Sequence, residues 1–359
     1  MYKLFSVVMI LVLYVTGASF AQDETNNALQ NLLESYRDAG SPAVTLFVWT
    51  PDATYSAATG IVDVESGELI TADARFRIGS VSKTYTSVVT LQLVDEGLID
   101  VDAPISTYLP EMTANIDGAE AVTVRQLLTM TSGLYEYLND DFYDAILDDP
   151  NQDWTPTRAI EAYVYDEPAF FAAGTEFEYT NTNYLLLQLI VESVTGQPLH
   201  EVVREYILDP IGAANTYTQI QETLPGEFVH GYEDLDGDGT LDDAFAINDG
   251  AGMGDGALIA NGQDVALFYT ALFYEEDLLE DNTLAMMLVD PLESEYGMGI
   301  EVLDDADYGT IYGHSGSVLG FTSDARYFVD EEMIVVLLHA DDELDFDLIW
   351  DTVDLIAGE

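Results

Sequence analysis

Charge balance is the strongest constraint on this chain. Its 359 residues include 67 Asp and Glu but only 9 Lys and Arg, a formal net charge of −58. Such a surface repels phosphate backbones and anionic lipid headgroups, which excludes nucleic-acid binding. Hydrophobic residues make up 48% of the chain, enough to exclude a disordered protein. We therefore expect a folded core inside a solvated, salt-tolerant acidic surface.

Length and cysteine content limit the architecture further. The chain is longer than the ~250–300 residues at which single hydrophobic cores stop growing, which predicts two lobes. It has no cysteine, so disulfides, a thiol nucleophile and a Cys-based zinc site are excluded. His200, His230 and His339 stand apart without the paired spacing of metal ligands. We predict neither a metal nor a cofactor.

The first 21 residues have the pattern of a secretory signal peptide. A positive start, Met1–Lys3, precedes an uncharged apolar run, Leu4–Phe20, and Ser19-Phe20-Ala21 resembles a cleavage site. The mature chain would begin near Gln22 and work outside the cytoplasm, secreted or periplasmic. Because the run is near the lower limit of ~17–25 residues for a membrane span, a retained anchor is the alternative.

Without Lys3, the mature chain contains a single lysine, Lys83, three residues after Ser80. Residues 74–78 read as a strand, Gly79 as a turn, and residues 84–96 as an apolar helix. Ser80 and Lys83 would then lie one helical turn apart on one face. A serine hydroxyl becomes nucleophilic when a neighbouring base takes its proton, and a buried lysine can be that base because desolvation lowers its pKa. An ordinary surface lysine is the alternative.

Two further segments fit acyl-transfer chemistry. Tyr179 and Asn181 precede an apolar helix, and side chains at i and i+2 of an extended segment point the same way. Taken alone, they could equally be a core tyrosine and a helix N-cap. His314 and Gly316 share one face of a predicted strand, where the glycine would allow close approach of a ligand. A satisfied core histidine is the alternative there.

Together these segments resemble the penicillin-recognising serine hydrolases. The branch is that of class C β-lactamases, secreted D-alanyl-D-alanine carboxypeptidases and β-lactamase-like esterases. The resemblance covers roughly residues 30–340. It rests on Ser80-x-x-Lys83, Tyr179-x-Asn181 and His314-x-Gly316, on residues 93–102, and on the Leu-Leu-x-x-Thr-Ser-Gly-Leu stretch at 127–134.

The resemblance implies a role for each matched residue. Ser80 would be the acylated nucleophile, and Lys83 and Tyr179 would share the proton transfers. Asn181 would hold Lys83 and the substrate amide, and His314 would be a polar, titrating group near the substrate. The backbone N–H groups of Ser80 and Ser317 would form the oxyanion hole.

Three departures from the family pattern bear on the substrate. Met130 replaces the usual His of the 127–134 stretch, which we interpret as a packing change. His314 stands where other members carry Lys, which disfavours an efficient β-lactamase. The strand before it ends in Glu301, and besides His314 only Arg326 is a nearby cation that could read a substrate carboxylate. These features weaken the carboxypeptidase interpretation and favour an esterase.

The predicted fold is α+β, of the β-lactamase/transpeptidase-like type. It has an antiparallel sheet flanked by terminal helices at 28–37 and 344–356, with strands at 43–49, 55–64 and 296–340 and a helix at 266–279. Residues 22–83 plus 266–359 would form the α/β lobe and residues 84–265 an inserted all-α lobe, with the active site in the cleft between them.

An acidic segment, Asp234–Asp243, follows part of the EF-hand calcium pattern. It has Asp at loop positions 1, 3, 5 and 9 and Gly at position 6, but Phe245 where the bidentate Glu belongs. A hairpin turn built on Asp-Gly is the alternative.

The sequence therefore predicts a secreted serine hydrolase that acts through an acyl-enzyme on small-molecule or short-peptide acyl substrates. It would be of the D-alanyl-D-alanine carboxypeptidase or esterase type. The alternatives are a class C-like β-lactamase and a catalytically silent protein that binds penicillin or cell-wall peptide. We expect no membrane insertion after signal removal.

Overall fold

The computed structural model describes residues 22–36, 43–226, 228–235, 237–245, 247–250, 252–341 and 347–358. The predicted signal peptide, residues 1–21, lies outside the described residues. Within the described ranges, no helix is both long enough and apolar enough to cross a membrane.

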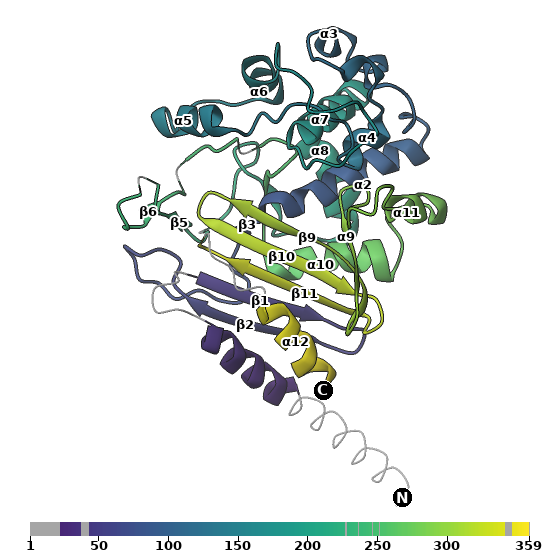
Figure 1. The fold of residues 1–359 in the computed structure, drawn as a ribbon. Coiled ribbons are helices and arrows are strands. Elements are labelled where there is room, and N and C mark those ends of the chain that lie inside the picture. Colours follow the sequence, from purple (N-terminus) through teal and green to yellow (C-terminus); the bar gives the residue numbers. More distant parts are fainter. Residues whose placement is uncertain are drawn as a thin grey trace, which may run out of the picture.

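A six-stranded antiparallel sheet forms the base of the molecule (Figure 1). Its order is β2–β1–β11–β10–β9–β8, so β1 from the start of the chain pairs with β11 from its end. The strands are β1 (Ala43–Trp49), β2 (Thr54–Gly60), β8 (Glu301–Asp305), β9 (Gly309–Val318), β10 (Phe321–Phe328) and β11 (Met333–His339). Both faces of the central strands are buried, which explains the nearly continuous apolar sequences of β1 and β11.

The two terminal helices cover one face of this sheet (Figure 1). They are the helix over residues 22–36 and α12 (Asp347–Ala357). Leu29, Leu33 and Val353 pack with the alternate residues Val335 and Leu337 of β11. Apolar residues about one helical turn apart on the terminal helices thus pack against every second residue of the strand in one cluster.

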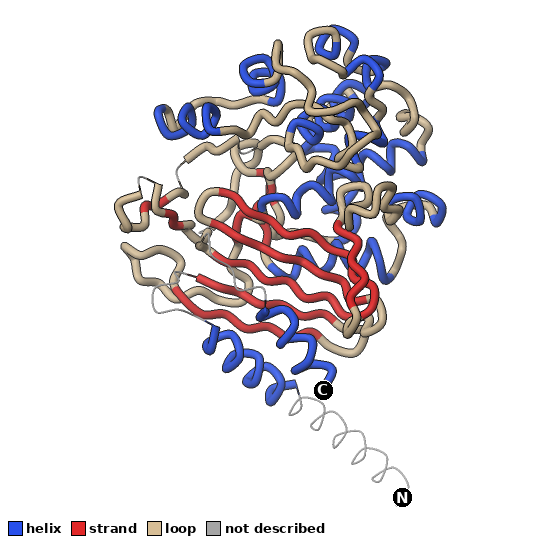
Figure 2. Tube along the Cα trace, viewed as in Figure 1, coloured by secondary structure: helices blue, strands red, loops and turns tan. Residues whose placement is uncertain are grey.

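The opposite face of the sheet packs against the larger core. Most of the helices lie beyond the sheet, in the upper half of Figure 2. α10 (Gly262–Tyr269) contacts β1, β10 and β11 on the face with the larger core. The longest helices of this half are α2 (Ser82–Asp95) and α7 (Thr182–Thr195), which pack together. The shorter helices are α3 (Pro110–Thr113), α4 (Val124–Leu128), α5 (Asp140–Asp148), α6 (Pro156–Tyr163), α8 (Leu199–Val203), α9 (Asp209–Ile211) and α11 (Asp281–Met287). Single 3-10 turns lie at η1 (Gly79–Val81), η2 (Ile105–Thr107) and η3 (Ala119–Ala121), and π-helical segments at η4 (Arg204–Leu208) and η5 (Thr270–Tyr274).

The inserted segment between the outer strands is not purely helical. β3 (Phe76–Arg77), β7 (Leu258–Ala260) and β4 (Tyr217–Thr218) form a three-stranded sheet in that order, and β5 (Tyr232–Glu233) pairs with β6 (Asp242–Asp243). β7 brings the end of the insertion back beside the turn that contains Ser80, because Phe76 pairs with Ala260.

The acidic segment predicted as calcium loop or hairpin connects β5 and β6. Carboxylate oxygens of Asp234 and Asp238 accept the backbone N–H groups of Gly239 and Thr240, at 2.8 Å each. Asp236 lies outside the described residues, and no metal-binding group of three or more acids or histidines occurs in the part that is described. β5 and β6 pair antiparallel, so the described residues form a hairpin, and calcium binding stays a prediction.

Several element boundaries differ from the sequence prediction. β2 ends at Gly60, where φ is 111°, instead of continuing to residue 64. The helix predicted from residue 266 starts earlier, because the Asn261 side chain accepts the backbone N–H of Asp264 as an N-cap.

Candidate active site

The turn between β3 and α2 presents Ser80. Gly79 has a φ of 47°, in the left-handed region, and Ser80 lies in the single turn η1 that leads into α2. A Cβ on Gly79 would lie 2.9 Å from the backbone nitrogen of Ser317 on β9. Glycine is therefore needed both for the turn and for the close approach of β9.

Lys83 lies beneath Ser80 at the start of α2 and is completely buried. Its Nζ donates to the Ser80 Oγ at 3.0 Å and to the backbone oxygen of Asp255 at 2.8 Å. Burial lowers the pKa of the Lys83 ammonium to about 8, and the nearby acids Asp255 and Glu136 only partly oppose that effect. No ion pair joins Lys83 to a described carboxylate. The contact between Lys83 and Ser80 is the one predicted from the Ser-x-x-Lys spacing.

Tyr179 lies beside the same pair. Its ring centroid is 5.0 Å from Lys83 Nζ, and its buried hydroxyl has no hydrogen-bond partner of good geometry among the described residues. Burial raises the Tyr179 pKa well above its ordinary value, although the neighbouring Ser80 hydroxyl opposes the shift. Tyr179 is therefore a neutral phenol at physiological pH, able to donate a proton or to relay one.

Asn181 lines the cleft beside Ser80 but differs from the prediction in its partner. Its backbone N–H and side-chain amide donate to the Glu136 carboxylate, at 2.5 and 3.3 Å. The hydrogen bonds of Lys83 go to Ser80 and Asp255 instead. Glu136 was not predicted from the sequence, because only the fold brings residue 136 against the start of α7.

His314 is buried next to Tyr179, but both of its ring nitrogens have protein partners. Nδ1 lies 2.6 Å from the backbone oxygen of Ser315, which can only accept, so this nitrogen carries the proton. Nε2 then accepts from the Tyr296 hydroxyl at 3.0 Å. Burial lowers the His314 pKa despite the attraction of Glu301. His314 is thus a neutral group that positions Tyr296, where the sequence predicted a titrating group at the substrate.

Gly316 and Ser317 bring the edge of β9 to the nucleophile. A Cβ on Gly316 would clash with the backbone oxygen of Ile78 and lie 3.0 Å from the Ser80 nitrogen. From the sequence we expected Gly316 to allow close approach of a ligand. In the structure the missing side chain allows close approach of the turn that contains Ser80.

The register of β9 orients the Ser317 amide. β8 pairs with β9 only as far as Gly313, so the edge of β9 beyond Gly313 is open on that side. The Ser315 N–H points to this side, where it donates to Glu301. The Ser317 N–H, two residues on, points the same way. The Ser317 amide therefore lies on the open edge of β9, next to the Ser80 turn, and its role in an oxyanion hole stays a prediction.

Arg326 is not available to read a substrate carboxylate. Its guanidinium donates to Glu301 at 2.6 Å and lies 2.6 Å from Asp324. Although burial alone would lower its pKa, these two carboxylates raise the Arg326 pKa above its ordinary value. The one arginine that the sequence nominated for this role is fully paired.

The cleft beside Ser80 has a cavity volume of about 50 Å³. It is lined by Ser80, Tyr137, Leu138, Tyr143, Asn181, Asp249, Gly250, Asp255, Gly256 and residues 317–319. Asp255 and Asp249 were missed in the sequence. Both lie in the glycine-rich stretch 249–256, and an acid flanked by glycines, as Asp255 is, could have marked them as close to a site.

Met130 confirms the interpretation of a packing change. It is fully buried, with a φ of 56°, and its Sδ accepts from the Asn183 amide at 3.4 Å. Asn183 also accepts from Ser132 at 2.6 Å.

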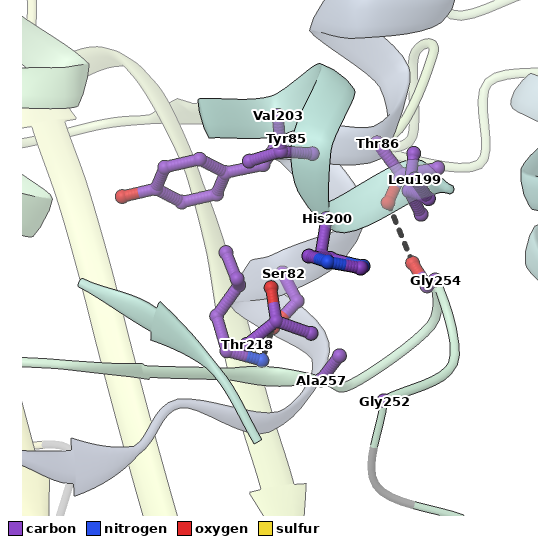
Figure 3. Close-up of a pocket in the computed structure, with 11 residues that line it drawn as sticks. Ser82, Tyr85, Thr86, Leu199, His200, Val203, Thr218, Gly252, Gly254 and Ala257 are labelled. Atoms are coloured by element: carbon purple, nitrogen blue, oxygen red, sulfur yellow. Dashed lines mark hydrogen bonds between the residues drawn. The ribbon is translucent and has the colours of Figure 1, made fainter. Parts of the chain in front are cut away.

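A second, smaller pocket lies on another side of α2 (Figure 3). Tyr85, Leu199 and Val203 give it an apolar lining, and the Thr86 hydroxyl donates across it to the backbone oxygen of Gly254 at 2.7 Å. Neither Ser80 nor Lys83 lines this pocket, so it is separate from the nucleophile.

Comparison with known proteins identifies the class. A family model described as Beta-lactamase matches residues 27–358. The chain belongs to the Beta-lactamase family, a family of serine hydrolases with the β-lactamase fold.

Two curated relatives match about half of the chain. Penicillin-binding protein 4 of Amycolatopsis lactamdurans is 30% identical over 184 residues, which are 51% of this chain and 46% of that protein. Esterase EstB of Burkholderia gladioli is 33% identical over 182 residues, 47% of this chain and 45% of that protein. The matches thus span less than half the length of either relative.

Solved structures match nearly the whole chain. A D-stereospecific amidohydrolase from Streptomyces superposes with a TM-score of 0.79 at 26% identity, covering 94% of this chain and 99% of that one. A penicillin-binding protein from Bacillus halodurans gives a TM-score of 0.78 at 25% identity, covering 92% and 98%. These neighbours establish the β-lactamase/transpeptidase-like fold predicted from the sequence.

Proposed function

We propose that this protein is a serine acyl-enzyme hydrolase of the esterase or amidase type, with Ser80 as nucleophile. The observation that carries the proposal is the 3.0 Å contact between Ser80 Oγ and a buried Lys83 whose pKa is lowered to about 8. A lysine without an ion pair can lose its proton near physiological pH and then act as a base.

In the acylation step, Ser80 Oγ attacks the substrate carbonyl and its proton passes to Lys83 Nζ. The carbonyl oxygen becomes an oxyanion held by the backbone N–H groups of Ser80 and Ser317. The proton moves from Lys83 through the Tyr179 hydroxyl to the leaving group, which departs as an alcohol or amine. In deacylation a water molecule attacks the Ser80 ester, the base takes the proton of that water, and Ser80 leaves with a proton returned to Oγ.

The paired state of Arg326 favours substrates without a free carboxylate at the leaving group. A carboxylate loses its hydration on binding and needs a fixed cation in exchange. Among the residues that line the described cleft there is no arginine or lysine, and Lys83 beneath it already contacts Ser80 and Asp255. Similarity to an esterase and to an amidohydrolase supports the same choice.

Covalent labelling tests the nucleophile. Incubation with a fluorophosphonate or fluorescent penicillin, followed by mass spectrometry of the peptides, should place the label on Ser80. Ser80→Ala should lose all labelling while keeping the circular dichroism spectrum. Label on any other residue, or label that persists in Ser80→Ala, would falsify the assignment.

A substrate comparison tests the choice of acyl donor. We expect short-chain p-nitrophenyl esters to show higher kcat/KM than diacetyl-lysyl-D-alanyl-D-alanine at the same pH and at high salt, where long-range repulsion is screened. A faster reaction with the peptide would favour the carboxypeptidase alternative.

We also propose that the protein works outside the cytoplasm. The support is the signal-like pattern of residues 1–21 in the sequence. Expression in a bacterial host followed by N-terminal sequencing of the exported protein should give a start near Gln22. An unprocessed N-terminus in the membrane fraction would favour the anchor.

A further inference from the structure

We propose that Tyr137 is a positioning residue for the Lys83 base. Its hydroxyl holds the side chain of Asp255, and the backbone oxygen of Asp255 orients Lys83 Nζ towards Ser80. The inference rests on the proposed function and deepens it, because it names a residue outside the reacting groups that sets the geometry of the base.

Three hydrogen bonds connect Tyr137 to the nucleophile. The Tyr137 hydroxyl donates to Asp255 Oδ2 at 2.7 Å, and Lys83 Nζ donates to the backbone oxygen of the same aspartate at 2.8 Å. Lys83 Nζ also donates to Ser80 Oγ at 3.0 Å. Tyr137, Asp255 and Lys83 are all buried, and a hydrogen bond in such an interior is stronger than one in water.

Asp255 lies between two glycines and needs side-chain contacts to keep one conformation. The preceding residue has such contacts: Thr86 of α2 donates to the Gly254 oxygen at 2.7 Å, and Gln188 of α7 accepts the Gly254 N–H at 2.6 Å. The Asp255 carboxyl has the Tyr137 hydroxyl as its one side-chain hydrogen-bond partner within the described residues. Removal of that hydroxyl would therefore release the residue that presents its backbone oxygen to the base.

Tyr137 is itself fixed by the helical half of the molecule. It lies between α4 and α5, and its ring packs edge-to-face on Phe142 of α5, with 5.1 Å between the ring centroids. Its backbone N–H donates to the Thr182 hydroxyl at the start of α7, at 3.0 Å. Burial raises the Tyr137 pKa well above its ordinary value, so the hydroxyl keeps the proton that it donates. Packing thus fixes this hydroxyl without any contribution from a substrate.

The backbone oxygen of Asp255 restricts the direction of the lone pair on the base. A neutral lysine amine has two N–H groups and one lone pair. When one N–H donates to the Asp255 oxygen, rotation of the amine is restricted and the lone pair can be directed at Ser80 Oγ, the other partner of Nζ among the described residues. A base that is held in the reactive geometry before the proton transfer works faster than one that must find it.

This chain of contacts does not depend on the charge of Asp255. Burial raises the pKa of the Asp255 carboxyl, whereas Lys83 and the Tyr137 hydroxyl oppose the shift. Oδ2 can accept from the phenol whether the group is ionised or carries a proton on Oδ1. The backbone oxygen accepts from Lys83 in either state.

Loss of the Tyr137 hydroxyl should also lower the Lys83 pKa. Burial lowers this pKa, and the two acids that face Lys83, Asp255 and Glu136, raise it. The other titratable side chains beside Lys83 are neutral at physiological pH: Tyr179, Tyr184 and His314. Without the phenol, Asp255 is closer to neutral and its backbone oxygen holds the Lys83 ammonium less well. Both changes favour unprotonated Lys83.

Tyr137→Phe tests the inference because it removes the hydroxyl and keeps the ring. For p-nitrophenyl acetate we expect the plateau of kcat/KM at high pH to fall at least about fivefold, as for one lost hydrogen bond. The pH midpoint of kcat/KM should move below that of the wild type. A variant that is merely less stable would lose activity at every pH and keep the midpoint.

Tyr163→Phe is the matched control. It removes a hydroxyl from a half-buried ring that packs on the same Phe142, with 5.4 Å between centroids, and it should keep the wild-type plateau and midpoint. Circular dichroism checks that both variants fold. A Tyr137→Phe enzyme with the plateau and midpoint of this control would overturn the inference.

Variants of Asp255 test whether the hydroxyl acts through this residue. In an Asp255→Ala background, Tyr137→Phe should change kcat/KM by less than about twofold, because the contact is already absent. Asp255→Asn keeps an acceptor for the hydroxyl and should retain more activity than Asp255→Ala, a comparison that remains if Tyr137→Phe does not fold. An undiminished effect of Tyr137→Phe in the Asp255→Ala background, or equal losses in the two Asp255 variants, would contradict the proposed route.

The labelling experiment separates the two proposals. Absence of label on Ser80 and of any hydrolysis would defeat the proposed function. Labelled Ser80 and turnover of the ester, with Tyr137→Phe equal to Tyr163→Phe, would defeat only the present inference.

Discussion

Lys83 and Arg326 are two buried cations in a chain that has few, and their surroundings are opposite. Lys83 has no ion pair with any described residue, and burial lowers its pKa to about 8. Arg326 contacts two carboxylates, Glu301 and Asp324, each at 2.6 Å, and its pKa is raised. An unpaired buried cation can release its proton and act as a base, whereas a paired one is a fixed structural charge. The difference shows that burial alone does not decide what a cation does.

The same contrast appears between the two sides of the sheet. Arg326 and Asp324 lie on the same strand face as Phe328, which packs in the cluster under the terminal helices. His314 and Gly316 lie on the other face, towards Tyr179 and Ser80. Strand alternation thus places Arg326 and Asp324 on the face opposite His314, and Glu301 at the sheet edge lies 3.7 Å from His314 Nδ1 and links the two faces.

Exchanging the lysine for arginine should have the largest effect. Lys83→Arg keeps a positive charge but cannot lose its proton, so kcat/KM for p-nitrophenyl esters should fall by about 10²- to 10⁴-fold. The reverse exchange, Arg326→Lys, is the matched control and should leave kcat/KM little changed. A Lys83→Arg enzyme with nearly full activity would show that Lys83 is not the proton acceptor.

Removing the paired cation should mainly reduce stability. Arg326→Ala leaves Glu301 and Asp324 without their partner, and we expect the free energy of unfolding to fall by about 3–5 kcal/mol. Arg125→Ala removes a solvent-exposed pair with Asp102 and should cost less than about 1 kcal/mol. Urea denaturation measures both. Similar losses in the two variants would contradict the distinction between buried and exposed pairs.

The pH dependence of kcat/KM should follow the protonation of Lys83. Acylation needs Lys83 without its proton, so kcat/KM for a neutral ester should rise about tenfold per pH unit below the Lys83 pKa of about 8 and level off above it. Asp255 is the strongest of the charges that raise this pKa, so Asp255→Asn should move the midpoint to lower pH. A midpoint that moves to higher pH would contradict the assignment of the titrating group.

Salt should produce the smallest effect. Salt shortens the Debye length to about 3 Å at 1 M and thereby screens the repulsion between acidic side chains. The thermal midpoint should therefore rise from low to molar NaCl. The kcat/KM for a neutral ester should change less over the same range, because the Ser80–Lys83 contact is buried. A thermal midpoint that is flat or falls would exclude surface repulsion as a major term.

The sequence by itself determined the local elements of the site. Ser80 and Lys83 are three residues apart at a helix start, so their contact follows from helical geometry, and the structure gives 3.0 Å. The sequence likewise predicted a strand at 43–49, strands within 296–340 and the two terminal helices, which form the sheet and its outer layer. These inferences depend only on contacts between near neighbours or on a regular period.

Only the tertiary structure decided the partners that lie far apart in the chain. Asp255 reaches Lys83 across 172 residues, Glu136 reaches Asn181 across 45, and Arg326 pairs with Glu301 across 25. The sequence predicted Arg326 as a possible carboxylate reader and His314 as a titrating group, and neither role agrees with the contacts that the fold creates. The physical reason is that the charge state of a buried group depends on desolvation and on the nearest opposite charge, and both are set by packing, not by residue type or local spacing.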